Sequence, residues 1–168
     1  MGSMRVYVPA TLTMLHQMLS DGRLEPASLT AFALTPRLRE NYVAGTEEEL
    51  EYAAMAEAAR ASLRLIALEQ AGGPEPRRVV VTAKVDGVTP RPDLDDGAVR
   101  LSGPLPLESV VAVHVDTAEA AAAVTAAAAV VDAADLGDTD AEFVLGDAED
   151  HELAWYDPSE LPFLLELL

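Results

Sequence analysis

The stretch GTEEELEYAAMAEAARASLRLIALEQAGGPEPRRVVVTAKV, residues 45–85, decides the fold class. Thr46 and Glu49 have the spacing of a capping box, and an acidic first turn favours the positive end of a helix dipole. This pattern predicts a long helix that begins at Thr46 and ends at the glycines before Pro74. Residues 78–85 are rich in β-branched side chains and tend to alternate in polarity, which predicts a strand. A long helix followed by a strand indicates mixed α and β structure.

One face of this long helix is expected to pack across a sheet, because its apolar residues recur at helical spacing. The predicted stripe consists of Leu50, Ala54, Ala58, Ala61, Leu65 and Leu68. Glu57, Arg60 and Arg64 form a polar stripe on another face.

Two shorter units upstream are predicted to run from a strand into a helix. Strand 5–8 leads to Thr11, which has the position of an N-cap for a helix over residues 12–19. Strand 30–34 leads to Thr35, and Pro36 then suits the first position of a short helix that ends near Val43.

Downstream, the apolar run 109–115 is typical of an interior strand that is buried on both faces. Asp116 and Glu119 have capping spacing for an Ala-rich helix over residues 118–134. This helix is expected to pack on the sheet, and its small side chains could alternatively serve a homo-oligomer contact.

The C-terminal segment is predicted to contain a β-hairpin. An acidic turn over residues 135–140 is followed by two apolar runs, 142–145 and 152–156, that look like paired short strands. Pro158 then opens a last helical turn.

Together these elements predict an α+β or α/β fold in one domain, residues 4–168. We expect a mixed sheet of about five or six strands with three main helices packed on it. Those helices begin near Leu12, Thr46 and Ala118. Residues 1–3 resemble an expression scar and are left out of the prediction.

The charge of the chain is concentrated in its second part. All 11 Lys and Arg residues lie in the first hundred positions, whereas residues 101–168 carry fifteen Asp and Glu and no Lys or Arg. Net charge −18 opposes contacts with the phosphates of nucleic acids. The acidic segment suits a basic protein surface, a divalent metal, or solubility and salt adaptation alone.

Several classes of function are disfavoured by what the chain lacks. It has no Cys, which excludes disulfides and thiolate chemistry. No apolar run approaches the roughly 20 residues of a membrane span, and no signal sequence is apparent, so a cytoplasmic location is expected. Phosphate-loop, dinucleotide-binding, nucleophile-elbow and zincin motifs are missing, which argues against an enzyme and against a bound cofactor.

The three histidines have different expected roles. His16 is expected to pack on the apolar face of the first helix, and His114 to be a neutral, hydrogen-bonded sheet residue. His151 stands among carboxylates, and hard oxygen ligands with one imidazole can hold Mg²⁺ or Mn²⁺. A weak metal site is therefore predicted at Asp147, Asp150, His151 and Glu152. A solvated hairpin loop is the alternative interpretation.

A weak anion site depends on the arrangement of the first two strands. If these strands are parallel neighbours, the helix N-termini at Thr11 and Thr35 would converge at one sheet edge, with Arg37 and Arg39 beside the second. Otherwise Thr11 and Thr35 only cap their helices.

The stretch ELAWYDPSELP, residues 152–162, resembles the strand, turn and helix near the end of many Nudix hydrolases. The glutamates of the Nudix box are not matched, because the corresponding positions fall on Ala59–Arg60 and Arg64–Ala67. This resemblance therefore implies no catalytic residue.

Nearly the whole chain from Met4 resembles a family of uncharacterised actinobacterial proteins. The matching stretches are MRVYVPAT (4–11), ELEYAA (49–54), DLGD (135–138) and DAEDHEL (147–153). The resemblance implies a soluble single domain without an assigned activity.

The leading functional hypothesis is a non-catalytic binding or regulatory domain whose acidic C-terminal half meets a basic protein surface. The alternative is a divalent-metal enzyme that acts on a phosphorylated small molecule. Nucleic acids and membranes are not expected partners.

Overall fold

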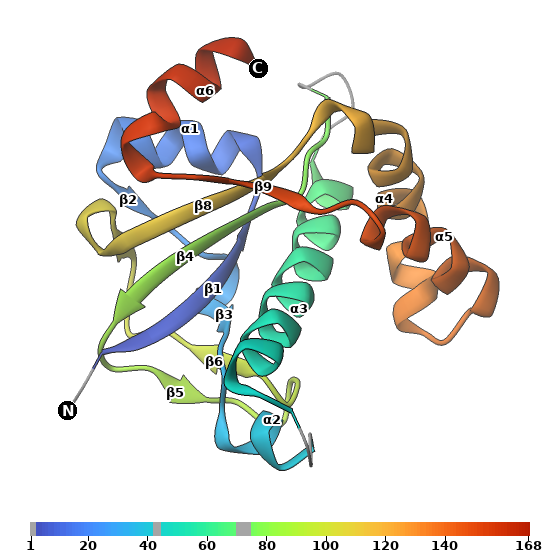
Figure 1. The fold of residues 1–168 in the computed structure, drawn as a ribbon, viewed down its shortest axis with the longest axis horizontal. Helices are drawn as coiled ribbons and strands as arrows, with labels where there is room; N and C mark the ends of the chain where they lie inside the picture. Colours follow the sequence, from blue (N-terminus) through green and yellow to red (C-terminus); the bar gives the residue numbers. More distant parts are fainter. Residues whose placement is uncertain (1–2, 42–44, 70–74) are drawn as a thin grey trace.

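The computed structural model describes residues 3–41, 45–69 and 75–168. A seven-stranded antiparallel sheet forms the centre of the fold (Figure 1). The strand order is β5-β6-β3-β1-β4-β8-β9. The strands are β1 (Met4–Ala10), β3 (Thr30–Phe32), β4 (Val79–Val85), β5 (Thr89–Pro90), β6 (Ala98–Arg100), β8 (Val110–Asp116) and β9 (Leu153–Tyr156). β2 (Arg23–Leu24) and β7 (Leu105–Pro106) pair separately.

The mixed α and β class is confirmed, but the sheet is larger than predicted. It is also not mixed, because each of its strand pairs is antiparallel. β1 and β4 pair along their whole lengths, from Met4 opposite Val85 to Ala10 opposite Val79. These two strands form the buried centre of the sheet, while β5 and β9 are its edges.

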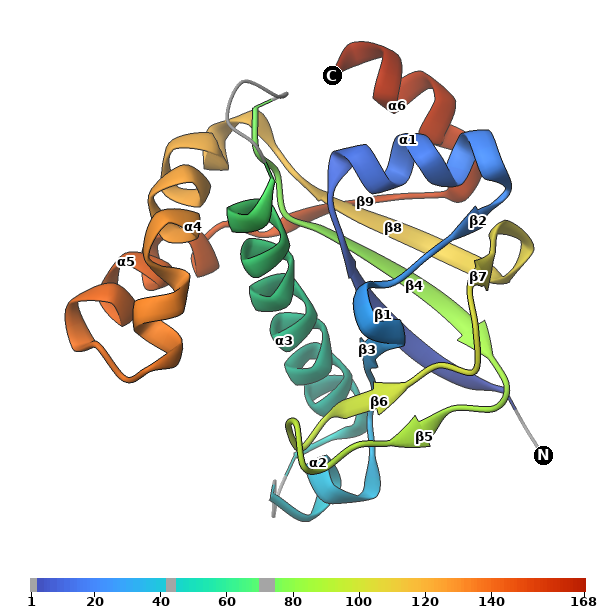
Figure 2. The same cartoon turned by 180° about the vertical axis from the view of Figure 1, so that it is seen from behind.

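Helices cover the two faces of the sheet. α1 (Leu12–Asp21) and α6 (Leu161–Leu167) pack side by side on one face, and α3 (Glu47–Leu68) crosses the other (Figures 1 and 2). Side chains of β1 alternate accordingly: Val6 and Val8 face α1, whereas Tyr7 faces α3. α2 (Pro36–Asn41) is a short helix after β3.

Three of the predicted helix caps are present. Thr11 accepts a hydrogen bond from the backbone N–H of Met14, Thr35 from Leu38, and Thr46 from Glu49. The predicted end of the second helix near Val43, and the predicted end of the long helix before Pro74, lie outside the described residues. α3 itself ends at Leu68.

The buried face of α3 turns along its length. Leu50, Ala54 and Ala58 are buried as predicted, but the next buried residues are Ala59, Ser62 and Leu63. Leu68 is 82% exposed, so the predicted stripe is wrong in the last part of the helix. The reason is that the later turns of α3 pack against a second pair of helices as well as the sheet.

That second pair consists of α4 (Ala121–Asp135) and α5 (Thr139–Glu149). The predicted strand over residues 142–145 is wrong, since this segment lies within α5. β9 is a strand as predicted, but it pairs with β8. α5 begins where Asp138 accepts a hydrogen bond from Ala141 N–H, and Gly137, with φ of 96°, ends α4.

The Ala-rich helix packs on other helices more than on the sheet. Val124, Ala127, Val131 and Ala134 of α4 are buried in a cluster with Leu63 of α3 and residues of α5. The predicted cap before this helix is also wrong. Asp116 binds Arg78, and the short 3₁₀ helix η3 (Ala118–Ala120) begins without a side-chain cap.

No described helix has the length and apolarity needed to cross a membrane.

Candidate functional site

The structure does not gather the predicted metal ligands into a metal site. Asp147 and Asp150 are exposed at the C-terminal part of α5, and Glu152 is exposed before β9. His151 is half-buried, and its backbone carbonyl accepts a hydrogen bond from Arg78. Across residues 3–41, 45–69 and 75–168, no group of three or more His, Asp or Glu side chains could hold a metal ion.

The residues of the predicted anion site are also not brought together. β1 and β3 are antiparallel neighbours, so Thr11 and Thr35 follow strands that finish at opposite ends of the pair. Arg37 forms an ion pair with Asp96 at 3.5 Å. The premise of parallel neighbours was wrong, and both threonines act as helix caps.

Two histidine predictions have opposite outcomes. His16 is exposed on α1, so its predicted packing role is wrong. His114 is half-buried on β8, and its Nε2 lies 3.0 Å from Thr82 Oγ1. Burial lowers the pKa of His114 below its ordinary value, which keeps it neutral as predicted.

Most late carboxylates without a structural partner lie on one unit, which we call the acidic hairpin: residues 118–152. Six of the fifteen bind an arginine or cap a helix: Asp116, Asp135, Asp138, Glu142, Asp157 and Glu160. The other nine are exposed. Seven of these belong to the acidic hairpin: Glu119, Asp132, Asp140, Asp147, Glu149, Asp150 and Glu152.

Two large apolar side chains project from the acidic hairpin. Phe143 on α5 is 78% exposed, and Leu136 in the turn between the helices is 90% exposed. On α5, Asp140 and Asp147 share the helical face of Phe143, because they are three and four residues away from it. The opposite face, which includes Leu145, is buried against α4. An exposed aromatic side chain is therefore flanked by carboxylates.

Two arginines of α3 hold this unit in place. Arg60 Nη2 lies 2.6 Å from Glu142 Oε1 and 3.0 Å from Asp135 Oδ1. Arg64 Nε lies 2.7 Å from Asp135 Oδ2. The hydrogen bond from Arg64 lowers the pKa of Asp135, and the one from Arg60 lowers the pKa of Glu142. The network orients the acidic hairpin and neutralises two of its carboxylates.

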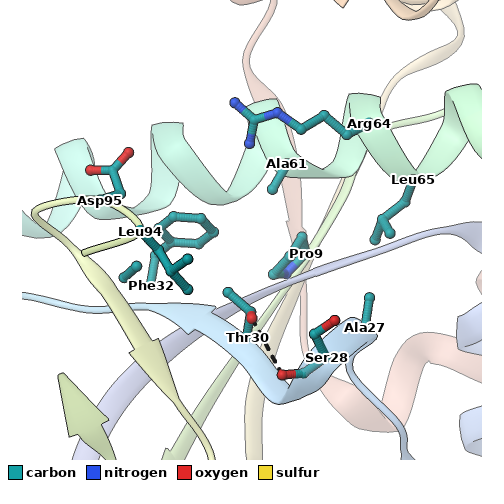
Figure 3. A pocket seen from close by; sticks show the side chains of 11 residues that line it. Pro9, Ala27, Ser28, Thr30, Phe32, Ala61, Arg64, Leu65, Leu94 and Asp95 are labelled. Carbon is teal, nitrogen blue, oxygen red and sulfur yellow. Dashed lines mark hydrogen bonds between the residues drawn. The ribbon is translucent and has the colours of Figure 1, made fainter. Parts of the chain in front are cut away.

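A separate cavity lies on the other side of α3, facing β3 (Figure 3). Its volume is about 340 Å³. It is lined by Pro9, Ala27, Ser28, Thr30, Phe32, Ala61, Arg64, Leu65, Leu94, Asp95 and Ala98. We call it the α3 pocket. These residues come from four separate segments of the chain, so no sequence spacing indicates their proximity.

Comparison with known proteins identifies a family but no activity. A family model described as a family of unknown function (DUF6912) matches residues 4–165. No curated protein and no solved structure matches the chain. The predicted resemblance to an uncharacterised family is confirmed at this level.

Proposed function

Since the chain belongs to this family of unknown function, we propose from its surface that it is a non-catalytic binding module for a basic, partly apolar protein segment. The segment docks on the outer face of the acidic hairpin. The observation that carries this proposal is Phe143, which is 78% exposed between Asp140 and Asp147.

Phe143 and Leu136 supply the apolar part of the interaction. Removing a Phe side chain from water on docking contributes roughly 1.5–3 kcal/mol. Aromatic anchors of this kind commonly dominate the energy of small interfaces. The two side chains are too few for a large apolar interface, which favours a short partner segment.

The carboxylates determine which segment is accepted. The seven exposed Asp and Glu side chains of the acidic hairpin that neither bind an arginine nor cap a helix attract Lys and Arg and repel acidic partners. Residues 101–168 contain no Lys or Arg that could compete for them. The arginines that reach the hairpin from α3, Arg60 and Arg64, bind Asp135 and Glu142 rather than the outer face.

Binding of a short amphipathic Lys/Leu peptide, followed by NMR at low and high salt, tests the proposal. We expect binding at low salt, weakening as salt screens the charges, with signal shifts centred on α5. Replacement of every Lys in the peptide by Glu should abolish binding. Phe143→Ser should weaken binding by about tenfold or more, consistent with loss of one apolar anchor.

Phe163→Ser is the matched control, since Phe163 is also exposed, at 70%, but lies on α6. It should leave binding unchanged. Equal effects of the two substitutions, or shifts spread over the whole surface, would contradict a specific docking face. Absence of binding at low salt would contradict the proposal and indicate that the seven exposed carboxylates of the outer face serve solvation.

A further inference from the structure

The α3 pocket has the size and lining of a small-molecule site. Its volume of about 340 Å³ lies within the range of known ligand pockets. Pro9, Phe32, Leu65 and Leu94 supply a largely apolar lining. Phe32 is on β3 and Leu65 is on α3, so the pocket lies between these two elements. Elsewhere along their contact, α3 and the sheet are held together by a buried apolar cluster.

Negative charge is concentrated at one end of the α3 pocket. Asp95 lines this end, and the half-buried Glu57 carboxyl on α3, which is not itself part of the lining, is near enough to feel its charge. Burial first, and then the charge of Asp95, raises the pKa of Glu57. Two adjacent carboxyl groups repel each other when both are ionised, and a bound cation would relieve that repulsion.

The single basic residue that lines the pocket does not offset this charge. Arg64 donates hydrogen bonds of 2.7 and 2.9 Å to Asp135 of the acidic hairpin. In Figure 3 its guanidinium extends along α3 and does not turn down toward Pro9. The charge of Arg60 also works to lower the pKa of Glu57, but its guanidinium is bound to Asp135 and Glu142.

A hydroxyl group is held toward the other end of the pocket. Ser28 lies in the 3₁₀ helix η1 (Ala27–Leu29) with φ of 54°, and Leu29 follows with φ of 55°. Non-glycine residues in this left-handed region cost roughly 1–2 kcal/mol each. In Figure 3 the Ser28 hydroxyl points from the turn toward α3.

We propose that the α3 pocket binds a small organic amine. The ammonium group binds Asp95, with the negative charge of Glu57 nearby, the carbon skeleton packs on Phe32 and Leu94, and a polar substituent can reach Ser28. Anionic ligands are disfavoured by the carboxyl pair. A bare divalent ion is disfavoured because the described residues offer no group of three ligands. This site is distinct from the acidic hairpin and does not depend on its partner.

Calorimetric titration with a panel of linear and aromatic primary amines, including phenethylamine, tests the proposal. 2-Phenylethanol and 3-phenylpropanoate serve as neutral and anionic counterparts. We expect at least one amine to bind about tenfold or more tightly than both counterparts. NMR shifts should centre on Phe32, Leu94 and the backbone of Ser28.

Asp95→Asn and Glu57→Gln should each weaken amine binding by about tenfold, because each removes a negative charge from the ammonium site. Asp93→Asn is the matched control. Asp93 lies in the same turn but is bound to Arg91 outside the pocket. Thermal melts of each variant report whether the fold is retained.

Three outcomes would overturn the proposal. They are no binding by any amine of the panel, equal binding of phenethylamine and 2-phenylethanol, and equal losses in Asp93→Asn and Asp95→Asn. Each result is independent of peptide docking on the acidic hairpin, so the two proposals fail separately.

Discussion

Arg78, immediately before β4, and Asp116, at the end of the neighbouring strand β8, form a buried ion pair. Arg78 Nε and Nη2 lie 2.8 and 2.7 Å from the two oxygens of Asp116. The side chains are only 4% and 0% exposed. Arg78 also donates a hydrogen bond to the carbonyl of His151, at 2.8 Å. One guanidinium thus joins the start of β4 and the end of β8 to the segment that leads into the edge strand β9.

Asp116→Asn should lower the free energy of unfolding by about 3–5 kcal/mol, because it leaves the Arg78 charge buried without a counter-charge. Urea denaturation measures the change. Asp132→Asn, at an exposed position of α4, should change stability by less than about 0.5 kcal/mol. Similar losses in the two variants would show that the buried pair has no special role.

Ser62→Ala should also destabilise the protein. The fully buried Ser62 hydroxyl donates to Ala10 O at 2.8 Å and accepts from Val79 N–H at 3.0 Å, at the end of the β1–β4 pairing. Its removal leaves two buried backbone groups without this partner, at a cost of about 1–3 kcal/mol. Denaturation of Ser62→Ala, with the exposed Ser20→Ala as control, measures the effect. Equal stabilities would contradict the bridging role.

Acid should weaken the attachment of the acidic hairpin to α3. The arginine network lowers the pKa values of Asp135 and Glu142, so its stabilising contribution is present above the ordinary carboxyl range, about pH 4, and is lost as the pH falls through the lowered pKa values. The contribution is modest because solvent screens these groups.

Thermal melts as a function of pH check this expectation. The melting temperature of Arg64→Gln should depend less on pH in the acid range than that of the unmodified protein. Parallel pH profiles would show that Asp135 does not contribute through this network.

Glu57→Gln should stabilise the protein at neutral pH. The pKa of Glu57 is raised in the folded state, so its contribution to stability is greatest when the carboxyl is protonated and is lost as the pH rises through the raised value. Gln resembles the protonated form at every pH. The gain in melting temperature should therefore disappear in acid, and a gain that persists there would contradict this cause.

Ser28→Gly should raise stability by roughly 1 kcal/mol, because glycine adopts positive φ without the steric cost that Ser28 bears. Chemical denaturation measures this gain. Ser102→Gly, at an exposed position without positive φ, should give no gain. A loss of stability in Ser28→Gly would show instead that the backbone at Ser28 is not strained.

Local capping signals were reliable guides to the helices of the first half. Thr35 and Thr46 each bind the N–H three residues later, as their sequence context predicts, because a cap depends only on neighbouring residues. The same rule failed at Asp116. Its partner, Arg78, is 38 residues away, and sequence spacing carries no information about such a pair.

The missed helix α5 shows a different limit. Residues 142–145 form a short apolar run that suits a strand or a helix, and its length cannot separate the two. The helix signals were nonetheless present: Gly137 before Asp138, an acidic first turn, and small or apolar residues at positions 141, 145 and 148. The predicted β-hairpin, in which residues 142–145 pair with residues 152–156, obscured this helical periodicity.

The candidate sites were only partly foreseen. A basic-free acidic segment was visible in the sequence, whereas the exposure of Phe143 depends on which face of α5 packs on α4. No sequence pattern indicated the α3 pocket, because Glu57 and Asp95 are far apart in the chain. They come near each other only in the folded protein, where β6 lies beside β3. The strain at Ser28 was equally hidden, because left-handed turns usually contain glycine.

The two edges of the sheet differ in how they resist self-association. β5 contains Pro90, which cannot donate a backbone hydrogen bond to another strand. β9 has no proline, but Glu152 and Asp157 flank it and its neighbouring helix is acidic. Electrostatic repulsion between molecules thus takes the place of a steric block at this edge. We therefore expect colloidal stability in concentrated solution to depend on β9, and conditions that remove carboxylate charge to expose this strand first as a template for aggregation.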